Sequence, residues 1–324
     1  MKNKSKIISC LLGIMLMTIF TSCSNAQNTK QIAGEYENGL YIYEDGTFLA
    51  GGMNSVVFGT VEFEGDVINL IKHRPKYKFA LYGRKENSRV YGNTIMFEGF
   101  EDNGLVNLLE NNNPPTLVQR VFNKNANCFD WPFFYDNGED CKTIYFADES
   151  DKQLYKFELP KDYRDFVAFR FNFEDDPNLN EPIVATVSKD FNSISFYGSD
   201  KKINKKPLTQ EALEAKKMVF SMNERAYPEG KYYYCNPAYN IFEEQGIDIS
   251  QYEEFGYKGE GAFHLKGSEA YPKGERFEND YHDNAIIYRY EKIDPKIVEK
   301  TKYSIKEKSI FISECEDTQV DVAK

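Results

Sequence analysis

The chain has 324 residues, with 51 acidic and 40 basic side chains and a net formal charge of −11. This acidic balance disfavours binding to the phosphate backbone of nucleic acids. The length exceeds that of a usual single domain, so two domains are expected. Aromatic residues make up 15% of the chain, and such a composition favours β structure.

The first 23 residues have the layout of an export signal. Three lysines stand among the first six residues, an apolar run covers residues 7–20, and small residues lead into Cys23. The run is shorter than the roughly twenty residues that a transmembrane helix needs, so a cleavable signal is predicted. No later segment has enough consecutive apolar residues to span a membrane as a helix.

The sequence Phe20-Thr21-Ser22-Cys23 resembles the signal of a bacterial lipoprotein, in the looser form found in Bacteroidota. The resemblance implies that residues 1–22 are removed and that Cys23 carries a thioether-linked diacylglycerol and an N-acyl chain. Several acyl chains anchor a protein stably, because each buried methylene contributes about 0.8 kcal/mol. Ordinary secretion is the alternative, since Ser24-Asn25-Ala26 also fits a small-x-Ala cleavage site, with Gln27 as the mature start.

The residues after Cys23 bear on where the anchor lies. Residues 24–29 contain no acid, whereas surface lipoproteins of that phylum tend to carry acids there. We therefore expect an outer-membrane anchor that faces the periplasm, with the cell surface as the alternative. Loss of residues 1–22 leaves 37 basic against 51 acidic residues, a net charge of −14. Such a chain repels anionic headgroups, so the acyl chains alone are expected to hold it.

Residues 23–33 are expected to form a tether, and strand signals follow over residues 34–122. Asp45-Gly46 and Glu64-Gly65-Asp66 each separate two apolar runs, which predicts two hairpins, because tight turns need residues that accept positive φ. Runs at 77–83, 93–98 and 116–122 add further strands. This spacing is typical of a small antiparallel barrel or sandwich.

Four short motifs in this region resemble the lipocalin-like domains of bacterial lipoproteins. They are Gly34-Glu35-Tyr36, Tyr43-x-Asp45-Gly46-x-Phe48, Gly59-Thr60 and Gly65-Asp66-x-Ile68-x-Leu70. The resemblance implies a barrel with an apolar cup for a small ligand. It also implies that Arg120, on the last strand, covers the early Gly-x-aromatic motif. Val61 departs from the tryptophan that often follows Gly-Thr in the family.

A second, β-rich α+β domain is predicted over residues 123–315, with residues 316–324 as a solvated tail. The one clear helix runs from Thr209, a plausible N-cap, to Met222. Its apolar residues recur at helical spacing and are expected to face a sheet. Strand signals in the domain fall at 143–147, 153–159, 166–173, 183–187, 193–197, 262–266, 285–290 and 309–313.

Four cysteines remain in the mature chain after Cys23. They are Cys128, Cys141, Cys235 and Cys315, an even number in an oxidising compartment. Of the three possible pairings we expect Cys128–Cys141 and Cys235–Cys315, because Asn137-Gly138 lets the first loop turn back. Buried thiols are the alternative. A zinc site is not expected, because the sequence has no Cys-x-x-Cys.

The histidines and acidic clusters give no recognisable metal or catalytic site. His73, His264 and His282 are isolated from one another, and only His282 has acidic neighbours, so each is expected to be structural or a loop residue. Asp148-Glu149-Ser150-Asp151 and Glu174-Asp175-Asp176 lack the spacing of a calcium loop and are expected to be solvated turns. No cofactor is expected.

The densest tyrosine zone is the strongest candidate for ligand or partner contact. Tyrosine combines a large apolar ring with a polar tip and suits binding surfaces, although strand packing is the favoured explanation for the triplet itself. The zone contains Tyr232, Tyr233, Tyr234, Tyr239, Tyr252 and Tyr257.

Three functional hypotheses follow. The first is a non-enzymatic, lipid-anchored binding module of the envelope whose ligand is a small apolar molecule, a glycan or an envelope protein. The second is an extracytoplasmic hydrolase of glycosidase type, which needs two carboxylates, one with a raised pKa. The third is a structural accessory of an outer-membrane complex.

Overall fold

The computed structural model describes residues 27–37, 39–52, 55–86, 91–101, 103–108, 115–124, 132–151, 153–171, 181–240, 247–256, 261–269, 282–298 and 302–313. The described chain is mainly β with one long helix, which confirms the predicted fold class. It divides into two compact units. The barrel unit comprises Met1–Arg74 and Glu174–Val219, and the sandwich unit comprises Pro75–Phe173 and Phe220–Lys324.

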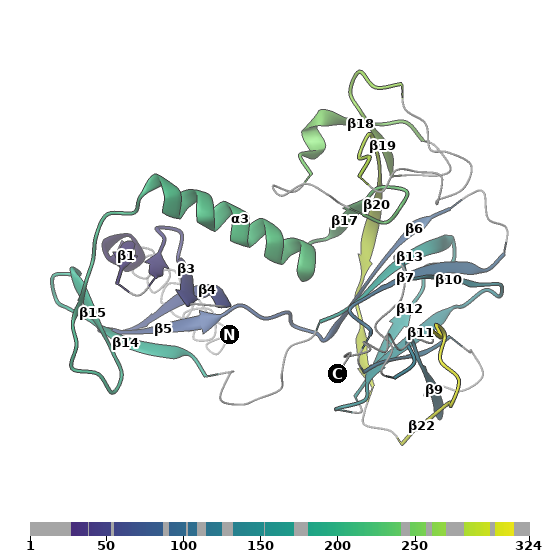
Figure 1. Cartoon of the computed structure of the whole chain (residues 1–324), viewed down its shortest axis with the longest axis horizontal. Coiled ribbons are helices and arrows are strands. Elements are labelled where there is room, and N and C mark those ends of the chain that lie inside the picture. Colours follow the sequence, from purple (N-terminus) through teal and green to yellow (C-terminus); the bar gives the residue numbers. More distant parts are fainter. Residues whose placement is uncertain are drawn as a thin grey trace, which may run out of the picture. The chain divides into compact units, whose positions relative to one another are not determined.

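The barrel unit is built on one eight-stranded antiparallel sheet that is nearly closed. Backbone hydrogen bonds between Glu35 and Lys206, at 2.9 and 2.8 Å, join the first strand to the end of the last. Figure 1 shows purple and blue strands from the start of the chain in one sheet with teal strands from its middle. In sheet order the strands are β1 (Gly34–Tyr36), β2 (Leu40–Ile42), β3 (Thr47–Gly52), β4 (Ser55–Glu64), β5 (Val67–Lys72), β14 (Ile183–Val187), β15 (Ser193–Phe196) and β16 (Ile203–Asn204).

Both predicted hairpins are confirmed. Strand β2 pairs with β3 around Asp45-Gly46, and β4 pairs with β5 around Gly65. Gly46 and Gly65 have φ of 85° and 69°, values that a residue with a side chain rarely adopts. The Asp45 side chain accepts from the Thr47 backbone at 3.1 Å, which fixes the first turn.

The barrel unit has an apolar core that includes the start of the described chain. Residues 27–32 are helical, Thr29 and Ile32 are buried, and Ile32 packs with barrel residues such as Phe48 and Leu70. The Tyr36 hydroxyl donates to the Ile32 carbonyl at 2.7 Å. The expected tether of residues 23–33 is therefore too long, because the fold already includes Thr29.

Helix α3 (Gln210–Ala226) confirms the predicted helix. The Thr209 hydroxyl accepts from the Ala212 backbone at 3.2 Å, as expected of an N-cap. The Tyr43 hydroxyl donates to the Ala212 carbonyl at 3.0 Å, and Lys216 forms an ion pair with Asp45. These contacts join the start of α3 to the β2–β3 hairpin, whereas Met222, expected to be buried, is 53% exposed.

The sandwich unit contains two sheets that pack face to face (Figure 1). The first sheet has the order β10 (Phe134–Asn137), β7 (Asn93–Glu98), β13 (Tyr163–Arg170), β6 (Phe79–Lys85), β20 (Ile286–Ile293), β19 (Ala262–Leu265) and β18 (Tyr252–Glu254), with β17 (Tyr232–Cys235) also paired to β20. The second has the order β21 (Lys296–Val298), β12 (Leu154–Glu158), β11 (Thr143–Asp148), β8 (Gly104–Asn107), β9 (Leu117–Arg120) and β22 (Ser304–Ile305). A short 3-10 helix covers Ile249–Gln251.

The first sheet of the sandwich unit is covered on both faces. One face packs through Phe79, Phe97 and Phe166 onto Phe146 and Phe157 of the second sheet. The opposite face includes Tyr82, Val167 and Phe169 and is covered by the segment that contains Cys235 and Tyr239. Strand β13 lies between β6 and β7, and its residues from Asp165 to Arg170 are buried on both faces.

The units do not follow the expected ranges 34–122 and 123–315. Strands β6, β7 and β9, expected to complete the barrel, lie in the sandwich unit together with β8, which was not expected. Strand β5 instead pairs with β14, so the barrel is completed by strands from beyond residue 180. The described residues contain no helix long and apolar enough to cross a membrane.

Candidate functional site

The register of β17 on β20 decides where the tyrosine triplet points. Tyr233 pairs with Tyr290, whereas Tyr232 pairs with Glu291 and Tyr234 with Arg289. Side chains alternate along a strand, so Tyr233 lies on one face and its two neighbours on the other. The triplet therefore divides between core and surface.

The inward tyrosines are structural. Tyr233 packs against Phe169, with ring centroids 5.0 Å apart, and against Tyr82 at 5.7 Å. Tyr239 is buried, and the Tyr252 hydroxyl donates to the Asn284 carbonyl at 2.9 Å. Tyr257 lies outside the described residues. Only part of the predicted zone can therefore meet a partner.

The outward tyrosines, Tyr232 and Tyr234, lie beside one phenylalanine and two cations. We call this group the aromatic–cation surface; it consists of Lys231, Tyr232, Tyr234, Phe263 and Arg289. The Arg289 guanidinium carbon lies 5.0 Å from the centroid of the Tyr232 ring and 5.2 Å from that of Phe263. The Lys231 ammonium lies 4.9 Å from the Tyr232 centroid. Such cation–π contacts fix the direction of long, otherwise flexible cations. Tyr232 is 39% exposed, so the arrangement reaches solvent.

Charge and burial differ within this surface. The Lys231 ammonium lies 3.8 Å from Glu291, and both side chains are largely exposed, so this ion pair is weak. Tyr234 packs edge-on against Phe263 with centroids 6.2 Å apart. Burial raises the pKa of Tyr234, although the nearby Arg289 opposes the rise. The phenol stays protonated at neutral pH and can both donate and accept a hydrogen bond.

A buried polar network supports the strands behind this surface. The Asp165 carboxylate accepts from Arg84 at 2.8 Å, from the Tyr239 hydroxyl at 2.8 Å and from the Tyr290 hydroxyl at 2.9 Å. The Arg84 guanidinium also lies 3.9 Å from the Tyr288 ring centroid. Asp165 thus connects β13, β6 and β20 with the turn that contains Tyr239.

The turn at Tyr239 is held in an unusual backbone conformation. Tyr239 has φ of 60°, which is uncommon for a residue with a side chain. The Asn236 side chain accepts from the backbones of Ala238 and Asn240, each at 2.9 Å. These bonds and the contact with Asp165 hold Tyr239 in place. The network thus joins this turn to strands β13 and β6 of the first sheet.

The acidic turn at residues 148–151 is not a solvated turn. Asp148 is fully buried and lies 2.7 Å from Arg170, while Glu149 pairs with Arg120 at 3.0 Å and Asp151 with Lys78 at 2.8 Å. Burial opposes ionisation of Asp148, but hydrogen bonds from Ser150 and the Arg170 charge outweigh it and lower its pKa. The other acidic cluster, 174–176, lies outside the described residues.

Arg120 does not have the role that the lipocalin resemblance implied. It lies in the sandwich unit, on β9, and its guanidinium contacts both oxygens of Glu149. Gly34-Glu35-Tyr36 lies in the barrel unit, where the Lys205 side chain covers Gly34. The resemblance placed the arginine in the wrong sheet because β6 to β9 do not belong to the barrel.

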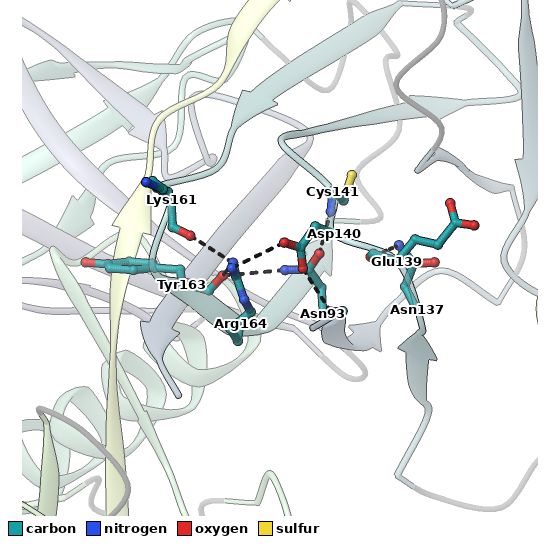
Figure 2. Close-up of polar contacts among 9 residues, drawn as sticks. Asn93, Asn137, Glu139, Asp140, Cys141, Lys161, Tyr163 and Arg164 are labelled. Carbon is teal, nitrogen blue, oxygen red and sulfur yellow. Dashed lines mark hydrogen bonds and ion pairs between the residues drawn. The ribbon is translucent and has the colours of Figure 1, made fainter. Parts of the chain in front are cut away.

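Cys141 lies in a connected set of polar contacts at the start of β7, β11 and β13, shown in Figure 2. Its backbone donates to the Asn93 side chain at 2.7 Å, and its thiol donates to the Thr143 carbonyl at 2.8 Å. The neighbouring Asp140 accepts from the Gly92 backbone at 2.9 Å and lies 3.4 Å from Arg164. These contacts position the loop that contains Asn137-Gly138.

The predicted disulfides stay predictions. Cys141 and Cys235 are both buried, and no disulfide joins these two described residues. Cys128 and Cys315, their expected partners, lie outside the described residues, as does the lipidation residue Cys23.

The three histidines have different surroundings. His73 stacks on Phe58 with centroids 4.9 Å apart, and His264 lies 3.3 Å from Glu253 on the neighbouring strand. His282 is exposed, and its neighbour Asp283 caps the Ala285 backbone at 2.8 Å. The described residues contain no group of three or more His, Cys, Asp and Glu side chains that could hold a metal.

Glu98 is the described carboxyl most suited to proton transfer. Burial, with a smaller contribution from Glu101, raises its pKa to about 7. Its Oε2 atom is buried and has no hydrogen-bond partner in the described part of the chain. The residue ends β7, on the face that carries Met96. A glycosidase acid needs such a pKa, but also a second carboxylate at a set distance.

The chain matches no family model, and no curated protein or solved structure is significantly similar to it.

Only half of the aromatic–cation surface could be predicted from the sequence. The tyrosines stand out as a triplet, but Phe263 and Arg289 are remote in sequence and meet them only through the β17–β20–β19 register. Side chains alternate along a strand, and this alternation was the one signal in the sequence that could tell which tyrosines face outward.

Proposed function

We propose that the chain is an exported, lipid-anchored protein of the bacterial envelope that binds a partner through the aromatic–cation surface. The observation that carries the binding role is the exposed Tyr232 ring with the Lys231 and Arg289 cations over it. The anchoring role rests on the signal-like residues 1–23 and on Cys23.

A protein partner suits this surface best. Tyrosine and arginine are enriched among the residues that contribute most to protein interfaces. The rings are fixed by β17, β19 and β20, so little conformational freedom is lost on binding. A glycan that carries acidic groups is the other ligand that these side chains suit.

The barrel interior is a weaker candidate for the binding site. An eight-stranded barrel is about wide enough for its own side chains to fill it. Buried Tyr36, Phe48, Ile68 and Leu70 pack together in the barrel core with Ile32 of the N-terminal helix. This packing favours a structural role for the barrel over that of an apolar cup.

The binding role is tested by cross-linking and co-purification of the acylated protein from its own envelope. Tyr232→Ala and Arg289→Gln should each reduce recovery of a specific partner about tenfold or more. Tyr197→Ala is the matched control, because Tyr197 is a tyrosine of the barrel unit that is 89% exposed. Equal recovery from Tyr232→Ala and from wild type would contradict the proposal.

The anchoring role is tested separately with Cys23→Ala. The exported variant should move from the membrane pellet to the soluble fraction, because it lacks the acylation site. An unmodified Gln27 at the N-terminus of the native protein would show ordinary secretion instead.

A hydrolase is a second candidate, and Glu98 is the observation that favours it. If the chain cleaves an envelope polysaccharide, Glu98→Gln should abolish turnover, because the amide cannot supply a proton. Glu62→Gln, at an exposed position of β4, should leave any turnover unchanged.

A further inference from the structure

The place where the N-terminal segment joins the fold is lined by lysines. The Lys205 ammonium donates to the Gln31 carbonyl, and the Lys205 side chain covers Gly34. The next residue, Lys206, is bonded through its backbone to Glu35. Lys30 belongs to the N-terminal helix itself. Lys205 and Lys206 therefore lie beside residues 31–35, at the start of the described chain.

Three of the lysines in this region are exposed and form no ion pair within the described part of the chain. They are Lys30, Lys202 and Lys206. Lys201 is paired with Glu37 at 3.1 Å, and Lys205 is engaged with Gln31. Residues 30–37 and 200–206 together contain five lysines and three acids, Glu35, Glu37 and Asp200, so these two stretches are positive on a chain that is strongly acidic overall.

The distance from Cys23 to the fold is short. Five residues lie between Cys23 and buried Thr29, so six residue-to-residue steps join them. A chain spans at most about 3.6 Å per residue, so an anchor at Cys23 lies within about 22 Å of Thr29. A tether of this length lets the side of the barrel unit that carries Lys30 and Lys206 reach the membrane surface.

We infer that Lys30, Lys202 and Lys206 contact anionic phospholipid headgroups of the membrane that holds the acyl chains. The inference rests on the proposed anchoring. The net charge of the whole chain led us to expect that the acyl chains alone hold the protein to the membrane. The inference changes this expectation, because the lysines attract headgroups locally even though the chain as a whole repels them. Electrostatic attraction fades within a Debye length, about 8 Å at physiological salt, so only cations near the anchor count.

Lysine acetylation on vesicles tests the inference with the acylated protein. The protein is reconstituted in phosphatidylcholine vesicles with or without about 30% phosphatidylglycerol, and acetylation of each lysine is followed by mass spectrometry. Lys30, Lys202 and Lys206 should react about fivefold more slowly on the anionic vesicles, and about 0.5 M sodium chloride should remove the difference. Lys302 and Lys308, exposed on the sandwich unit, should react equally on both vesicles.

A charge-removing variant gives an independent result. In Lys30→Gln/Lys206→Gln, the anionic vesicles should slow acetylation of Lys202 less than in wild type, whereas Lys302→Gln/Lys308→Gln should leave the protection of Lys202 unchanged. Equal acetylation of the wild-type lysines on both vesicles would overturn the inference. Failure of the wild-type protein to float with either vesicle would overturn the anchoring itself, so the two proposals fail in distinguishable ways.

Discussion

The barrel unit and the sandwich unit are stabilised in different ways. The core of the barrel unit is an apolar cluster of side chains from adjacent strands and the N-terminal helix. The sandwich unit also has apolar cores, but it contains two buried ion pairs, Arg84–Asp165 and Arg170–Asp148. The comparison shows that local hairpins define most of the barrel, whereas distant polar partners fix the sandwich.

The largest expected effect is on a fragment limited to residues 34–122. It contains β1 to β5 but lacks β14, which covers the β5 edge, and β13, which separates β6 from β7. We expect no cooperative unfolding transition by circular dichroism, because both units are left incomplete. A fragment that folds cooperatively would show that the units are not interleaved.

Replacement of the buried Asp165 should be the most damaging single change. Asp165→Ala removes one of the two carboxylates that pair with buried Arg84, the other being Glu86, and the acceptor of the Tyr239 and Tyr290 hydroxyls. We expect a loss of about 3 kcal/mol of unfolding free energy. Urea unfolding measures the change. Glu62→Ala, an exposed acid of the barrel unit, should alter stability by less than about 0.5 kcal/mol. Similar losses in the two variants would refute the contrast between the units.

Glu98 should destabilise the sandwich unit as pH rises. Its pKa is about 7 in the folded chain against 4.5 ordinarily, so the native state holds an extra proton between these values. The stability linked to this proton is complete below pH 4.5 and is lost as pH rises through 7. Glu98→Gln should therefore be more stable than wild type at pH 8 by about 1–3 kcal/mol, with little difference at low pH. Thermal unfolding across this range checks the sign, which a pH-independent difference would contradict.

The smallest effect concerns the hydrogen bond between the barrel and its N-terminal helix. Tyr36→Phe removes the bond to the Ile32 carbonyl but keeps the ring, so we expect a loss of about 1 kcal/mol. Tyr197→Phe is the control, because Tyr197 is 89% exposed. Faster hydrogen exchange at Ala33, whose backbone donates to Thr29 at 3.0 Å, should accompany the loss. Unchanged exchange would show that the helix does not depend on Tyr36.

Features encoded over short stretches were predictable from the sequence. The turns at Gly46 and Gly65 and the helix after Thr209 each depend on neighbouring residues, and each is found where expected. The N-terminal helix was missed because residues 24–32 are mostly polar, and the burial of Ile32 depends on a barrel that closes around it.

Features that depend on distant partners were not predictable. The pairing of β5 with β14 joins segments more than a hundred residues apart, and no local pattern specifies it. Asp148 was expected in solvent because its partner, Arg170, lies on another strand. The candidate binding surface was half predicted for the same reason, since Tyr232 belongs to a visible triplet while Arg289 does not.

The chain passes from the barrel unit to the sandwich unit, returns, and leaves again within α3, where Val219 and Phe220 are assigned to different units. A ribosome must therefore have synthesised β16 before the barrel can close, and β20 before the sandwich sheet is complete. It also follows that no single recombination breakpoint could duplicate, delete or transplant either unit intact. The two units are inherited as one piece.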